Sequence, residues 1–259
     1  MHFKNLYFTA ILLSIFLTNV TGQKASEPQT NLIEINQQSA LAAFSQQQKA
    51  VVAEGVLTNG FGTSVSISGT TAVVGSPFDD QNGNKDQGAA FVYVRNFGVW
   101  TLQARLVASD AAANDLFGSS VAISGETIVI GATKADGASI NSGAAYVFTR
   151  SGSTWTQQAK LNADNGLTDD NFGASAAING NTVAVGATLD DIGTGAANVD
   201  KGSTYIFVRS GTNWTQQASL SDPNGVSLSN FGCSLALNGE NLVVGANGFQ
   251  GFAYLFVRS

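Results

Sequence analysis

The chain has 259 residues, 12 of them basic and 18 acidic, and its formal net charge at pH 7 is −6. A net acidic chain is not attracted to nucleic acid or to an anionic membrane surface, so neither is expected as a partner. The only cysteine is Cys233, which excludes an intramolecular disulfide and leaves stability to the core. With 29 glycines and few charged residues, the chain favours many short strands joined by tight turns.

Residues 1–22 predict a secretory signal. Lys4 gives a positive start, an apolar run covers residues 6–17, and a small residue precedes the expected cut. The run is too short to span a bilayer and no later stretch is long enough, so we expect a secreted, extracellular protein without a membrane span. The only histidine, His2, lies in this signal, which excludes histidine-dependent catalytic and metal sites from the secreted part. Residues 23–43 are expected to form a loosely ordered lead.

A unit of about 55 residues recurs four times and predicts four short antiparallel strands per copy, the pattern of a β-propeller blade. Each copy starts near a Phe-Gly pair, at Phe61, Phe117, Phe172 and Phe231. A second glycine follows an apolar pair, at Gly75, Gly131, Gly186 and Gly245. An aromatic strand then ends at Arg95, Arg150, Arg209 and Arg258, and another strand starts at Trp100, Trp155 and Trp214. Aromatic residues repeated in every copy indicate core between blades.

The ends of the chain suggest how the blades close. The heptapeptide that starts at Phe44 resembles the one that starts at Trp155, and the last repeat stops at Ser259 without its Trp strand. We therefore predict an all-β fold over 44–259: a propeller of four four-stranded antiparallel blades, closed by the N-terminal strand, which completes the last blade. The alternative is an incomplete ring that closes by pairing with another chain, so the protein is expected to be a monomer or a ring-completing oligomer.

The paired motifs, such as Val-Val-Gly-Ser-Pro at 73–77, resemble the FG-GAP repeats of the integrin α-subunit N-terminal propeller and of related exported proteins, over residues 44–259. The resemblance implies a propeller whose loops meet protein ligands. Many FG-GAP repeats carry a calcium loop between their first two strands, but here that place holds a tight turn, as at Ser124-Gly125. The usual calcium site is not expected there, and no cofactor is required. The integrin propeller has seven blades, so its larger ligand platform is not carried over.

Successive connections of a blade leave at alternate ends, which puts every Asp in the loops of one face and the four strand-ending Arg residues at the other. Acidic loops suit a basic partner or a cation. The candidate ligand-binding residues on this face are Asp79, Asp80, Asp86, Asp136, Asp190, Asp191 and Asp200. If calcium binds, the candidate ligands are Asp110, Asp115, Asp164, Asp169 and Asp170. Alternatively, these residues only shape turns, because Asp side chains bond their own backbone.

Three functions fit these observations. The favoured one is a non-catalytic binding or adhesion module that meets an extracellular protein or glycan through the loop face. The second is a glycoside-hydrolase-like enzyme that uses Asp79, Asp169 and Asp190 across a narrow ring. The third is a structural surface repeat that self-associates. Asn213 starts an N-glycosylation sequon, which is usable if the host is eukaryotic.

Overall fold

The computed structural model describes residues 46, 48–50, 59–81, 83–191, 200–222, 225, 227–248 and 251–259. The predicted signal, the lead and Phe44 lie outside these residues. Contacts divide the chain into Met1–Ser45 and Gln46–Ser259, and the fold below is that of the second unit. Every regular element in the described part is a strand, and no helix there could cross a membrane.

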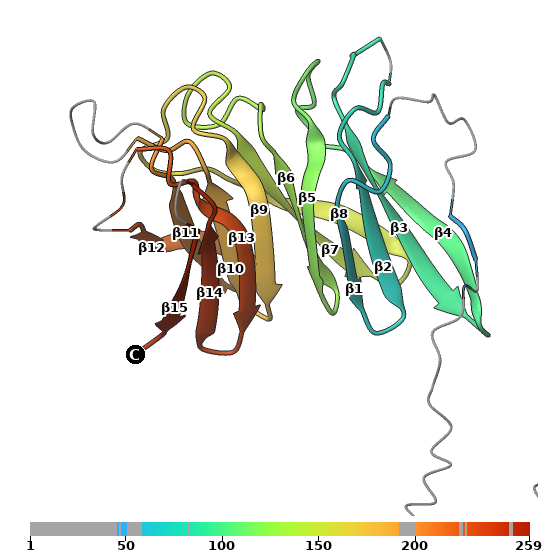
Figure 1. The fold of residues 1–259 in the computed structure, drawn as a ribbon. Coiled ribbons are helices and arrows are strands. Elements are labelled where there is room, and N and C mark those ends of the chain that lie inside the picture. The colour runs from blue at the N-terminus through green and yellow to red at the C-terminus, as the bar shows by residue number, and fades with distance from the viewer. Residues whose placement is uncertain are drawn as a thin grey trace, which may run out of the picture. The chain divides into compact units, whose positions relative to one another are not determined.

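The strands form four antiparallel sheets, here called blades 1 to 4, each built from consecutive strands (Figure 1). Blade 1 contains β1 (Val65–Ser68), β2 (Thr71–Ser76), β3 (Ala89–Asn96) and β4 (Val99–Leu106). Blade 2 contains β5 (Phe117–Ser124), β6 (Thr127–Ala132), β7 (Ala144–Ser151) and β8 (Thr154–Leu161). Blade 3 contains β9 (Phe172–Asn179), β10 (Thr182–Ala187), β11 (Ser203–Ser210) and β12 (Asn213–Leu220). Blade 4 contains β13 (Phe231–Asn238), β14 (Asn241–Ala246) and β15 (Phe252–Val257).

The first hairpin of each blade follows from its turn residues. Gly69, Gly125, Gly180 and Gly239 have φ between 55° and 57°, the left-handed region that a two-residue hairpin requires. The strands on either side then pair in register, as Ser124 does with Thr127 and Ile123 with Ile128. The all-β, propeller-like architecture of antiparallel blades is therefore as the repeat predicts.

The described residues supply three strands of the last blade, and the predicted fourth was to come from the N-terminal segment. Phe44, which was expected to start the missing strand, lies outside the described residues, so closure by this strand stays a prediction. The described part of this segment lies beside blade 1: the Gln48 side chain donates to the Trp100 carbonyl and accepts from the Trp100 backbone N–H.

The core lies between successive blades. Each blade has two faces: the head face is the one that packs on the preceding blade in blades 2 to 4, and the tail face is the one that packs on the following blade in blades 1 to 3. In blade 2 the head face includes Val121 and Ile123, which are buried with blade 1 residues. Its tail face includes Val129 and Val147, which are buried with blade 3 residues. The strands are apolar on both faces because both faces are covered.

The recurring glycines let blades approach each other closely. The carbonyl of Gly118 accepts a hydrogen bond from Ser64 Oγ at 2.8 Å, so blade 2 touches blade 1 through its backbone. A Cβ on Gly75 would lie 2.1 Å from that same carbonyl oxygen. The contact repeats between blades 2 and 3, where Ser120 Oγ donates to the Gly173 carbonyl. The two glycine motifs are thus the two sides of one contact between blades.

Three of the four Phe-Gly phenylalanines are core, as predicted, and Phe61 of blade 1 is half-buried. Phe117, Phe172 and Phe231 are fully buried. Each packs its ring against a tyrosine of its own blade, with ring centroids 5.5 Å apart for Phe117 and Tyr146. Such tilted aromatic pairs stabilise a core beyond the area that they bury.

Candidate binding surface

The long connections gather at one end of the strands, and the tight turns gather at the other (Figure 1). We call the first end the loop face and the second the turn face. All twelve candidate Asp residues lie in connections of the loop face. They differ in whether the carboxylate already forms an ion pair or a hydrogen bond within the protein.

Four of the predicted ligand-binding or metal residues are buried and engaged inside the protein. Asp79 forms an ion pair with Arg105, and Asp190 accepts a hydrogen bond from the Tyr205 hydroxyl. Asp115 accepts the backbone N–H of Ala112 at 2.7 Å. Asp170 accepts the backbone N–H of Leu167. These carboxylates hold loops to strands, and they are not on the surface that a partner meets.

A second group of carboxylates shapes the loops at one repeated position. Asp80 accepts the backbone N–H of Asp86 at 2.7 Å, and Asp191 accepts that of Asp200 at 2.9 Å. Asp136 accepts the backbone N–H of Asn141 at 2.9 Å. The residue that donates has positive φ in each case, a conformation that Asp and Asn tolerate better than most residues. Turn formation, the alternative interpretation of the sequence, therefore accounts for much of the acidity of this face.

Lysines neutralise two further predicted residues. Lys134 Nζ lies 2.9 Å from Asp169, and Lys160 Nζ lies 2.6 Å from Asp110. Lys160 also lies over the ring of Tyr146. Asp164 is exposed, and its backbone N–H donates to Gln216 Oε1 at 3.2 Å.

The carboxyl groups differ in proton affinity because their surroundings differ. Burial, together with the charges of Asp190 and Asp191, raises the pKa of Asp170 to about 6. Burial also raises the pKa of Asp115. For Asp110, burial raises the pKa, but the hydrogen bond and charge of Lys160 outweigh this effect and lower it overall.

The candidate metal ligands do not form a cluster. Among the residues that the structure describes, no group of three or more His, Cys, Asp and Glu side chains could hold a metal ion. The three carboxylates that a hydrolase would need also have separate partners: Arg105 for Asp79, Lys134 for Asp169 and Tyr205 for Asp190. Each of these three carboxylates is therefore engaged by a different side chain.

Apolar side chains stand among these carboxylates, a feature that the sequence argument missed. Phe78, Ile140, Leu167 and Leu228 are exposed, and each lies in a different connection of the loop face. Their only signal in the sequence is a large apolar residue inside an Asp- and Asn-rich loop. Exposed apolar side chains within a polar rim are typical of protein interaction sites.

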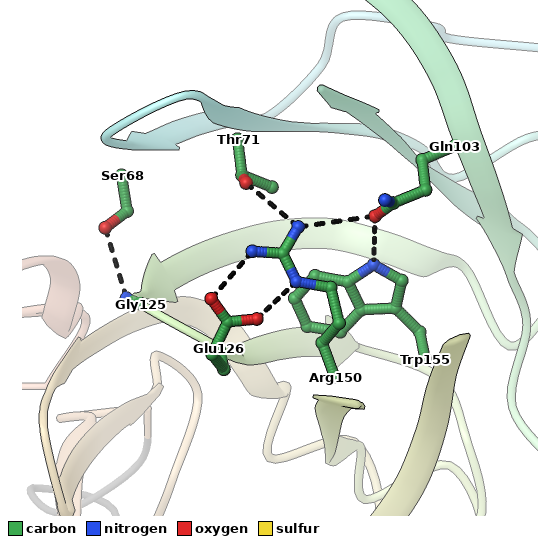
Figure 2. A network of polar contacts seen from close by, with 7 residues as sticks. All are labelled: Ser68, Thr71, Gln103, Gly125, Glu126, Arg150 and Trp155. Atoms are coloured by element: carbon green, nitrogen blue, oxygen red, sulfur yellow. Dashed lines mark hydrogen bonds and ion pairs between the residues drawn. The ribbon is translucent and has the colours of Figure 1, made fainter. Parts of the chain in front are cut away.

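On the turn face, the strand-ending arginines join neighbouring blades (Figure 2). Arg150 forms an ion pair with Glu126, and its Nη1 donates to Thr71 Oγ1 of blade 1 at 3.2 Å. Its guanidinium carbon lies 5.1 Å from the centre of the Trp155 ring. Trp155 Nε1 in turn donates to Gln103 Oε1 of blade 1 at 2.9 Å. Arg150, one of the four strand-ending Arg residues, therefore takes part in the contact between blades 1 and 2.

The same arrangement recurs in blade 3 and is incomplete in blade 4. In blade 3, Arg209 lies 5.2 Å from the centre of the Trp214 ring, and Trp214 Nε1 donates to Gln158 of blade 2. In blade 4, Arg258 reaches Thr182 of blade 3, but the repeat ends before a Trp strand. A pocket of about 320 Å³ occupies this place, and its lining includes Arg258, Thr182 and Gln217.

Two residues outside the loop face are placed as follows. Asn213, the sequon residue, is exposed at the start of β12. Cys233 is a free, half-buried thiol in β13.

Comparisons with known proteins agree with the repeat. The FG-GAP repeat family matches the chain at residues 44–93, 100–148, 155–207 and 214–256. The crystal structure of the computationally designed Ika4 protein is similar at 15% identity and a TM-score of 0.49, with 82% of this chain and 99% of that one covered. The crystal structure of Saccharomyces cerevisiae Sqt1 is similar at 14% identity and a TM-score of 0.43, with 73% of this chain covered. The matched part spans 43% of Sqt1. No curated protein matches the chain.

Proposed function

Because this chain belongs to the FG-GAP repeat family, whose repeat domains are generally non-catalytic, we propose that it is a secreted module that binds an extracellular protein through its loop face. Secretion rests on the signal in residues 1–22. The binding surface rests on one observation: exposed apolar side chains stand among exposed carboxylates on a rigid repeat scaffold.

The loop face suits a protein partner with apolar and basic groups. Ile140 and Leu167 are large enough to fill pockets on a partner. The exposed carboxylates of Asp80, Asp136 and Asp191, in connections of the same face, give that face negative charge. Asp136 accepts the backbone N–H of Asn141, next to Ile140, and Asp170 accepts that of Leu167, so the backbone at these two apolar residues loses little conformational entropy on binding. The protein partner is favoured over a glycan because none of the exposed loop residues named above is Trp or Tyr, the usual platforms for sugar rings.

The proposal is tested by capture of extracellular proteins from the host on the immobilised full chain. The double variant Ile140→Asp/Leu167→Asp should lose the captured proteins, because it places charges where apolar contacts form. Phe97→Asp is the matched control, since Phe97 is fully exposed but lies in the β3–β4 turn, away from the loop face. Rising salt should weaken capture by the wild type. Equal capture by the double variant and by the control would refute the loop face as the binding surface.

A further inference from the structure

The two end blades expose the surfaces that every other blade buries. Val65 on the head face of blade 1 is 69% exposed, whereas its counterpart Val121 in blade 2 is 7% exposed. Leu255 on the tail face of blade 4 is 80% exposed, whereas its counterpart Val147 is fully buried. Ile67 adds to the exposed head face. Contiguous apolar strand faces of this kind indicate a missing partner.

The same tail face continues across blade 4. Val243 and Val257 are exposed next to Leu255, and the counterpart of Val243 in blade 2, Val129, is fully buried under blade 3. The tail face of blade 4 therefore has the chemistry of an ordinary contact between blades, with nothing from the described residues covering it to the same extent.

The glycines of blade 4 indicate what should cover that face. In blades 1 to 3, a Cβ on Gly75, Gly131 or Gly186 would lie 2.0 to 2.1 Å from a carbonyl oxygen of the next blade. Gly245 occupies the same position in blade 4, but a Cβ there would meet only Ser234 and Cys233 of its own strand pair. Ser234 is exposed, although its three counterparts each donate to the next blade. Blade 4 thus keeps Gly245 and Ser234, the two residues of a contact that no described residue of its own chain completes.

The head of blade 1 carries the complementary groups. Gly62 follows the first Phe-Gly phenylalanine with φ of 94°, close to the 96° of Gly118, so its carbonyl is available to accept from a serine such as Ser234. Arg95 is the one strand-ending Arg without a preceding blade. Its counterpart Arg150 donates to Thr71, and the residue at the corresponding place in blade 4 is Asn241, whose amide oxygen can accept the same bond.

A pocket on blade 4 adds to the complementarity between blade 4 and the head face of blade 1. It lies beside Arg258 and Gln217, the counterparts of the Arg150 and Gln103 that hold Trp155. Such a pocket fits an aromatic side chain on a strand that pairs with the free edge of β15. A chain that presents its head face also brings Gln48, whose side chain is bonded to the Trp100 backbone of blade 1.

We propose that the tail face of blade 4 binds the head face of blade 1 from a second copy of this chain, and that two such contacts complete a head-to-tail dimer. Both end faces are exposed in the same molecule, and blades 1 and 4 stand at opposite ends of the row of blades (Figure 1). The partner's head repeats the contact that successive blades make within one chain. A head-to-tail contact that closes after two copies forms a ring and leaves no free apolar face.

Sedimentation equilibrium of the full purified chain tests this proposal, with a dimer expected at twice the chain mass of 26.7 kDa. Leu255→Asp and Ile67→Asp should each raise the dissociation constant by roughly 100-fold or more, because each buries an unpaired charge in the contact. Both side chains face solvent in the single chain, so both variants should fold, as judged by circular dichroism. Phe97→Asp, an equally apolar exposed position in the β3–β4 turn, should leave the dimer intact.

Mixing the two variants tests the orientation of the contact. A mixture of Leu255→Asp and Ile67→Asp chains can rebuild one native junction, from the intact tail of one and the intact head of the other. We expect dimers to reappear in the mixture at concentrations where each variant alone is monomeric. The proposal would be overturned if the wild type stays monomeric at 100 times the protein concentration used in the capture experiment. A wild-type dimer that Leu255→Asp breaks and Ile67→Asp leaves intact would also overturn it, since that result indicates tail-to-tail pairing.

Discussion

Replacing Gly131 with alanine tests whether glycine is required at this recurring position because the backbone of the next blade lies too close for a Cβ atom. The added Cβ would lie 2.0 Å from the Gly173 carbonyl oxygen, where ordinary contact begins at 3.4 Å. A backbone carbonyl cannot rotate away as a side chain can, so blades 2 and 3 must separate. Overpacking of this kind costs about 3 kcal/mol, and for a chain of this size about 3 kcal/mol lowers the melting temperature by roughly 6–12 °C.

Gly245→Ala is the matched control. A Cβ at Gly131 also meets Ser120 Oγ at 2.5 Å, and one at Gly245 meets the corresponding Ser234 Oγ at 2.3 Å. The two positions therefore share the serine contact and differ in the carbonyl of a following blade. Both variants are compared by calorimetry in the Leu255→Asp background, where blade 4 has no partner. Equal falls in melting temperature, or a fall below about 2 °C for Gly131→Ala, would refute the reasoning.

Two further predictions concern the loop face. Asp170→Asn should raise the melting temperature at pH 8 and change it little at pH 4. The pKa of Asp170 is raised to about 6 in the folded chain from an ordinary value near 3.8, so the wild type loses stability as the pH rises between these values, and the amide variant does not. A difference of the same size at both pH values would contradict this account. Millimolar calcium should leave the melting temperature within about 1 °C of its value in chelator, because Asp80, Asp136 and Asp191 each hold a backbone N–H separately. A clear rise with calcium would instead place a cation site on this face.

The repeat could be predicted from the sequence because the fold places the same physical requirement on the same position of every copy. Phe117 and its counterparts recur because each blade needs one large aromatic side chain in its core; Phe117, Phe172 and Phe231 are buried as expected, and Phe61 in blade 1 is half-buried. Gly125 and its counterparts recur because the first hairpin needs positive φ. Requirements of this kind act on single residues in every copy, so one sequence is enough to reveal them.

The candidate binding site was harder to predict from the sequence than the repeat. The sequence places Asp79 and Asp80 side by side, yet Asp79 is buried against Arg105 and Asp80 is exposed. Spacing along the chain does not say which carboxylate turns inward, because that depends on cations and hydroxyls from other strands. For the same reason, the sequence did not predict that the Ile140 side chain is exposed on the loop face.

The sequence by itself determined the family, the number of blades and the pairing of strands within each blade, because hairpins are local and the pattern repeats. Only the tertiary structure decided how blades meet: that Ser64 bonds to the backbone of Gly118, that Arg150 stacks on Trp155, and that Leu255 remains uncovered. These contacts join residues of different repeats, or depend on which blade face a neighbour covers. Whether a blade face is core or surface is set by its neighbour, and the residues of that face are apolar in either case.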